Sequence, residues 1–144
     1  MRLISKNELL NTILFICGIF MLLLLSSCMT VPKPEEIPED LPPEEYFQRA
    51  QEEVDNYNWE AALVYYKTFL ERHQDNPGRI VAAEYEIAFI NYKIGNYDTA
   101  EIQFTEILEK YEAAAEGELP ARFRVLSEKV LAKINEEEAE EDQE

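Results

Sequence analysis

The 144-residue chain is 47% apolar, which is enough for one domain with a packed core. Its 30 acidic and 13 basic residues give a formal net charge of -17. Nucleic-acid binding needs concentrated Lys and Arg, so this composition argues against a nucleic-acid partner.

Residues 1–27 have the features of a secretory signal peptide. Arg2 and Lys6 make the start of the chain positive, and an apolar run follows from Ile13 to Leu25. A run of this length is short for a membrane-spanning helix and typical of a signal peptide. The alternative is an uncleaved signal anchor, because apolar character extends back to Leu9.

The motif Leu25-Ser26-Ser27-Cys28 follows the apolar run directly. It resembles the bacterial lipobox, in which the Cys thiol receives diacylglycerol and the Cys becomes the first residue after cleavage. The resemblance implies a lipoprotein with diacylglycerol and an N-acyl chain on Cys28, anchored to a membrane and facing the periplasm. Met29 stands where an Asp would retain such proteins in the inner membrane, so the resemblance favours the outer membrane. The inner membrane and the cell surface are the alternatives.

Five of the seven prolines lie between Thr30 and Pro43, interleaved with acidic residues. This composition disfavours both helix and sheet. We therefore expect residues 28–43 to form an extended tether, in which the fourteen residues 30–43 alone would reach about 40 Å at roughly 3.1 Å per residue.

Residues 44–135 have the apolar spacing of a helical domain. A first helix is predicted to start at Pro43, and a second to run from Trp59 to about His73. Two further helices meet at Gly95 and Asn96, where Gly95 suits a left-handed helix end and Asn96 suits an N-cap.

A fifth helix is predicted from an apolar stripe near the C-terminus. The stripe consists of Leu119, Phe123, Leu126, Val130 and Ile134. Residues 136–144 contain seven acids in nine positions and are predicted to form a disordered, solvated tail.

The second and fourth helices repeat one apolar pattern at an offset of thirty-eight residues, with Trp59 aligned on Tyr97. The second copy, from Gly95 through Tyr97, Ala100 and Phe104 to Leu108, resembles the tetratricopeptide repeat (TPR). The first copy has Tyr57 in place of Gly95. The residues that define the repeat are Trp59, Ala62, Tyr66, Gly95, Tyr97, Ala100, Phe104 and Leu108.

This resemblance implies an all-α fold. It is a TPR-like α-solenoid of two helix-turn-helix repeats with a C-terminal capping helix, which covers the apolar edge that a repeat stack exposes.

A wider pattern resembles BamD-type outer-membrane assembly lipoproteins and Tol-Pal-associated TPR proteins. The residues that carry it are Phe69, Leu70, His73, Pro77, Ala83, Tyr85, Ile87 and Ala88. Those proteins have about twice as many repeats, so a full role in inserting barrel proteins is not implied.

No catalytic constellation is present in the sequence. His73 is the only histidine, and the mature domain after Cys28 has no cysteine, so no metal site is expected. Gly-rich phosphate loops and Ser-His-Asp sets are also missing. We expect a protein that is not an enzyme and that needs no cofactor or small-molecule substrate.

In TPR proteins the first helix of each pair lines the concave face. Carried onto this chain, the resemblance predicts a partner-binding groove formed by Phe47, Tyr85, Phe89, Tyr92, Lys93 and Phe123. Aromatic surface suits an extended peptide, because it gives contact area at low entropic cost. The alternative is that these aromatic residues belong to the core.

The sequence thus predicts a lipid-anchored TPR scaffold that binds a protein partner in the bacterial cell envelope, with an accessory role in outer-membrane protein assembly as one such task. The alternative is a structural or surface lipoprotein whose acidic tail makes charge-based contacts.

Overall fold

The computed structural model describes residues 30–141, with side chains as far as Glu137. This part is all-helical and has no strand. A short 3-10 helix at Pro34–Glu36 precedes α2 (Pro43–Asp55), α3 (Trp59–Arg72), α4 (Pro77–Lys93), α5 (Tyr97–Ala113) and α6 (Ala121–Glu141). The predicted signal peptide, Cys28 and the last three residues lie outside the described residues. From residue 30 to 141, no helix is long and apolar enough to cross a bilayer.

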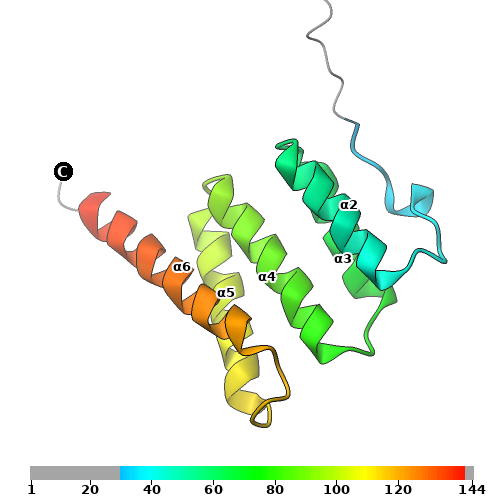
Figure 1. Ribbon diagram of the computed structural model, residues 1–144. Helices are drawn as coiled ribbons and strands as arrows, with labels where there is room; N and C mark the ends of the chain where they lie inside the picture. The colour runs from blue at the N-terminus through cyan, green and yellow to red at the C-terminus, as the bar shows by residue number, and fades with distance from the viewer. Residues whose placement is uncertain (1–29, 142–144) are drawn as a thin grey trace, which may run out of the picture. The chain divides into compact units, whose positions relative to one another are not determined.

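The helices form two hairpins and a final helix. α2 packs on α3, α4 packs on α5, and α6 packs mainly on α5. Figure 1 shows α2, α4 and α6 in the layer nearer the viewer, with α3 and α5 behind them. The first helices of the two pairs therefore share one layer with α6.

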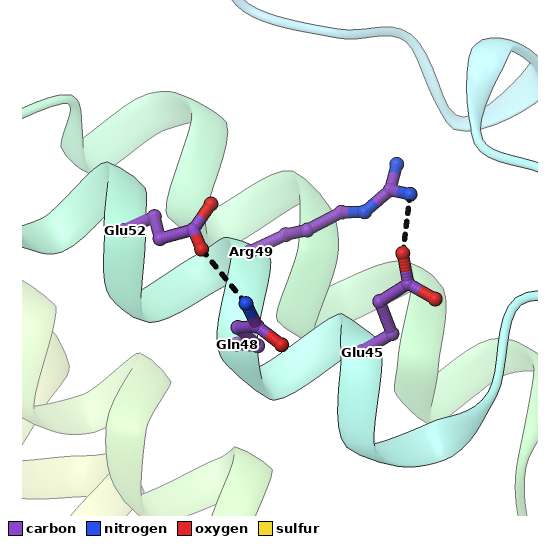
Figure 2. Close-up of polar contacts among 4 residues, drawn as sticks. All are labelled: Glu45, Gln48, Arg49 and Glu52. Carbon is purple, nitrogen blue, oxygen red and sulfur yellow. Dashed lines mark hydrogen bonds and ion pairs between the residues drawn. The ribbon is translucent and has the colours of Figure 1, made fainter.

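Local signals start the helices where the sequence predicts. α2 opens with Pro43 in its first turn and two glutamates, which suit the positive end of a helix dipole. Its outer face is stabilised by pairs one turn apart, with Arg49 donating to Glu45 at 2.6 Å and Gln48 donating to Glu52 at 3.0 Å (Figure 2).

The α4–α5 hairpin closes with a Schellman turn at Gly95. The Asn96 N–H donates to the Asn91 carbonyl at 2.9 Å, and the Gly95 N–H donates to the Tyr92 carbonyl at 3.1 Å. Gly95 has φ +81°, the left-handed conformation expected there. The expected side-chain cap at Asn96 is wrong, since no cap hydrogen bond forms and its amide donates to the Asn91 side chain at 3.3 Å.

The α2–α3 hairpin closes with the same turn although it lacks a glycine. The Asn58 N–H donates to the Glu53 carbonyl at 2.8 Å, and the Tyr57 N–H donates to the Val54 carbonyl at 2.9 Å. Tyr57 has φ +60°, and its side chain is 73% exposed. The two turns therefore share one backbone path, and Tyr57 adopts a conformation that glycine adopts more readily.

Two apolar clusters make up the core. Ala62, Tyr66, Ala100 and Phe104 are buried, whereas Trp59, Tyr97 and Leu108 are half-buried. The first cluster lies mainly between α2, α3 and α4, and the second between α4, α5 and α6. Equivalent positions of the two hairpins are thus buried to a similar extent, each in its own cluster.

The expected tether is wrong over the segment Pro34–Leu41, here called the strap. Ile37 and Leu41 are buried in the first cluster. The guanidinium of Arg72 donates to the carbonyls of Ile37 at 3.1 Å, Pro38 at 3.0 Å and Pro34 at 2.9 Å. Regular structure in the strap is limited to the 3-10 helix at Pro34–Glu36. The strap folds onto the domain because two apolar side chains and one guanidinium hold it there.

α6 departs from the prediction at two points. The helix continues to Glu141, so the expected disorder of the acidic tail is wrong for residues 136–141. Glutamate is a good helix former, and no Gly or Pro interrupts the segment. Leu126 is 38% exposed, while Ser127 is buried in its place, because the buried face steps through Phe123, Ser127, Val130 and Ile134.

Candidate partner-binding site

Two of the six predicted groove residues are buried and cannot offer contact surface. Tyr85 is 7% exposed and Phe123 is 4% exposed, and their ring centroids lie 5.3 Å apart. Burial raises the pKa of Tyr85 to about 12. For this pair the alternative is correct, since α6 packs over the aromatic face of α4 and makes it part of the second cluster.

Three further predicted residues follow along α4. The rings of Tyr85 and Phe89 are stacked 5.9 Å apart, and Phe89 lies 6.1 Å from Tyr92. Phe89 and Tyr92 are half-buried, and Lys93 is exposed. The Tyr92 hydroxyl donates to Glu137 at 3.4 Å, and burial, followed by that carboxylate, raises its pKa. This row joins α4 to α6, so its role in the described part of the chain is packing.

An open pocket of about 440 Å³ lies between the N-terminal ends of α2, α4 and α6. Phe47, the sixth predicted residue, is half-buried in its wall. The lining residues are Pro43, Glu44, Phe47, Asn76, Gly78, Arg79, Ala82, Pro120 and Arg122. The pocket therefore lies in the predicted layer of first helices, but nearer their starts than the aromatic row.

The first turns of α4 and α6 come close together at this pocket. A Cβ built on Gly78 would lie 3.3 Å from two ring carbons of Pro120. This distance is tighter than most real Cβ contacts, so glycine allows the two helix starts to approach. The Asn76 side chain accepts from the Arg79 N–H at 3.1 Å and caps α4.

Two arginines give the pocket local positive charge in a strongly acidic chain. Arg79 forms an ion pair with Glu44 across the pocket, and backbone hydrogen bonding, followed by Arg79, lowers the pKa of Glu44. The Arg122 guanidinium lies 4.4 Å from the centroid of the Phe123 ring. Burial raises the pKa of Glu86 on α4, and the charge of Arg122 opposes that shift. The site combines one aromatic ring with two guanidinium groups, a mixture suited to a peptide with apolar and acidic or carbonyl groups.

Sequence reasoning missed both arginines, although the sequence contains a signal for them. α4 and α6 are each preceded or opened by Pro-x-Arg, as Pro77-Gly78-Arg79 and Pro120-Ala121-Arg122. A proline that fixes a helix start also fixes where the side chain two residues later begins. The repeated triplet therefore predicts two arginines at equivalent helix starts.

His73 packs against two aromatic side chains at the end of α3. His73 stacks on Phe69, with centroids 5.2 Å apart, and meets Tyr46 edge-on at 5.4 Å, so it packs at the end of α3 instead of lying free on the surface. Among the residues that the structure describes, no group of three His, Cys, Asp or Glu side chains is arranged to hold a metal ion.

Comparison with known proteins gives one informative relative. The chain is 36% identical over 103 residues to an uncharacterized protein of Treponema pallidum (strain Nichols). The match covers 72% of this chain and 41% of that relative, so the chain spans less than half of the relative's length. No family model matches the chain, and no solved structure matches it. The similarity shows that a longer bacterial protein contains a region of this sequence type.

Proposed function

We propose that the protein is a lipid-anchored, TPR-like scaffold that binds a protein partner in the bacterial cell envelope. The observation that carries the proposal is the pocket between α2, α4 and α6, lined by Phe47, Arg79 and Arg122. It opens on the layer formed by the first helices, which is where the resemblance to TPR proteins expects a partner.

The TPR-like interpretation is supported by the equivalence of the two hairpins. Both close with the same pair of backbone hydrogen bonds at an offset of thirty-eight residues, and both place a buried aromatic ring, Tyr66 or Phe104, at the same point of the second helix. Repeats that share a turn and a packing position stack in the same way. α6 then occupies the place of the first helix of a third pair.

The lipid anchor rests on Leu25-Ser26-Ser27-Cys28. If Cys28 is acylated, Cys28→Ala should abolish incorporation of labelled palmitate and release the protein from the membrane fraction. Cys17→Ala is the matched control, since that residue lies within the predicted signal peptide. Equal palmitate labelling of both variants would contradict the anchor.

The partner site is tested by site-specific photo-cross-linking in intact cells. A photoreactive residue at Phe47 should give a discrete cross-linked product, whereas one at Ile102, an exposed apolar residue on α5, should not. Adding Arg122→Ala should reduce the product, and Arg124→Ala, which removes an exposed charge paired with Glu128, should leave it unchanged. The same products from both positions would contradict a specific site.

The resemblance to BamD-type lipoproteins makes an accessory role in outer-membrane protein assembly the first task to examine. The identity of the cross-linked partner decides it. A component of an assembly machine would support that role. An unrelated envelope protein would contradict the role in assembly but would still support a scaffold that binds a protein partner.

A further inference from the structure

α6 has an outer stripe that faces solvent along most of its length. Val125, Lys129, Ala132 and Glu136 recur at spacings of four, three and four, and all four are exposed. Val125 is 48% exposed, and Phe123, Val130 and Ile134 on the opposite side are buried. The stripe is therefore the exposed side of α6.

The charges of α6 are segregated along its axis. Residues 121–133 contain four basic residues and one acidic residue, whereas residues 134–141 contain five acidic residues and no basic one. No acidic residue lies in the first turn and no basic residue in the last turn. This order opposes the helix dipole, which favours acids at the N-terminus and bases at the C-terminus.

Within the described part of the chain, the other helices do little to compensate this pattern. The one ion pair that α6 forms there is internal, between Arg124 and Glu128 at 3.1 Å. α2 likewise has internal pairs one turn apart on its outer face, where Arg49 donates to Glu45 and Gln48 donates to Glu52 (Figure 2). Lys129 and Glu136, on the outer stripe, form no ion pair with another side chain among the described residues.

We propose that the outer stripe of α6 is a homodimer surface on which the α6 helices of two copies pair antiparallel. Antiparallel pairing places the basic half of each helix against the acidic half of the other. With the two-fold axis between Ala132 and Lys133, midway between the paired positions, Lys129 of each copy faces Glu136 of the other, so the contact repeats on both sides of the axis. The small Ala132 allows the helices to approach where they cross. The antiparallel pairing also sets the two helix dipoles in opposite directions, which is favourable.

The size of the surface predicts a weak dimer. A helix of 21 residues is about 30 Å long, and one helix pair covers less than the ~1,200–2,000 Å² of a stable interface. Each copy also carries a net charge of -17, which adds repulsion. The dimer should therefore form at high local concentration, and its specificity should lie in the charge pairs more than in the apolar area.

A charge-swap experiment on the full chain in detergent tests the proposal by sedimentation equilibrium. Wild type should show reversible dimerisation at concentrations up to about 0.5 mM. Lys129→Glu and Glu136→Lys should each weaken the dimer by about tenfold or more, because each puts like charges together twice. An equimolar mixture of the two variants should restore association to within a few-fold of wild type.

The control variants carry the same charge changes elsewhere. Lys67→Glu and Glu71→Lys alter exposed residues of α3 and should dimerise like wild type. A wild-type chain that stays monomeric at the highest concentration would overturn the proposal and leave the stripe to a different partner. Dimerisation that survives both reversals would overturn it too, and a mixture that fails to recover would exclude antiparallel pairing.

Discussion

The two hairpins place a basic side chain at the same point and use it differently. Arg72, near the end of α3, donates to the Tyr46 hydroxyl on α2 at 2.9 Å. Lys110 lies thirty-eight residues later and forms an ion pair with Glu84, the equivalent of Tyr46. Both residues join the second helix of a pair to the first.

The difference lies in what else each side chain reaches. The planar guanidinium of Arg72 has donors left over, and they bind three strap carbonyls, whereas the ammonium of Lys110 makes one ion pair. The strap then completes the first cluster, and α6 completes the second. The core cluster of each hairpin is thus completed by a segment from outside that hairpin, and only in the first hairpin does the basic residue also bind that segment.

The largest effect should come from the shared aromatic position of the two hairpins. Phe104→Ala removes a fully buried ring and should lower the free energy of unfolding by about 3–5 kcal/mol, and Tyr66→Ala should cost a similar amount. Urea denaturation followed by circular dichroism measures both losses.

The same experiment tests whether the hairpins form one cooperative unit. A single shifted transition for both variants means that they do. If instead Phe104→Ala leaves a separate transition for α2 and α3, the two clusters fold independently. Phe104→Leu, which keeps most of the apolar volume, is the matched control and should cost much less.

The next largest effect should separate Arg72 from Lys110. Arg72→Met keeps an apolar stem but removes four hydrogen bonds, so stability should fall by about 2–3 kcal/mol. Lys110→Met removes an ion pair with partly exposed partners and should cost about 1 kcal/mol or less.

Hydrogen exchange identifies the segment that Arg72→Met destabilises. Amides of residues 34–41 should exchange faster in Arg72→Met and at the wild-type rate in Lys110→Met. Arg72→Lys should also release the strap, since a lysine lacks the fork that reaches several carbonyls. Unchanged protection of the strap in Arg72→Met would show that Ile37 and Leu41 hold it without the guanidinium.

A smaller effect with opposite signs is expected at the two turns. Tyr57→Gly should raise stability by about 1 kcal/mol, because a left-handed conformation costs a non-glycine residue roughly that much. Gly95→Ala should lower stability by about 1 kcal/mol for the same reason. Thermal unfolding of each variant measures both changes.

The Tyr57 ring complicates the first of these changes in a way that can be controlled. It lies 5.8 Å from the Trp59 ring, edge-on, so Tyr57→Gly also removes an aromatic contact. Tyr57→Asn lacks that contact as well but tolerates the left-handed region better than tyrosine does, so it should fall between wild type and Tyr57→Gly. A loss of stability in Tyr57→Gly would mean that the ring contact outweighs the backbone strain.

Local signals in the sequence were sufficient for the helix starts and for the buried face of α3. Pro43, the turn at Gly95 and the spacing from Trp59 to Phe69 act within a few residues of the structure they determine. The strap could not be predicted in this way. Its conformation depends on Arg72, which lies more than thirty residues away. Composition alone predicts an extended tether for a segment rich in prolines and acids.

The candidate site could be predicted only in part, because it also depends on contacts between segments far apart in the sequence. The resemblance to TPR proteins placed Phe47 and Tyr85 on the layer of first helices, but only the packing of α6 determines that Tyr85 is covered and Phe47 stays open. Arg79 and Arg122 line one pocket, where Gly78 lets two helix starts approach that lie about forty residues apart in the sequence. The continuation of α6 beyond Asn135 was not predicted, because repulsion in a run of acids favours disorder. The helix propensity of glutamate outweighs that repulsion in α6.

The smallest expected effect concerns a polar group that only the first hairpin buries. Thr68 is buried on α3, and its hydroxyl has no hydrogen-bond partner among the described residues, whereas the equivalent residue on α5, Glu106, is exposed. Thr68→Val keeps the shape and removes the unpaired group, so the free energy of unfolding should rise by about 0.5–1 kcal/mol. Glu106→Gln should stay within about 0.5 kcal/mol of wild type, as expected for a surface change. If Thr68→Val is destabilising, the hydroxyl has a partner such as a bound water.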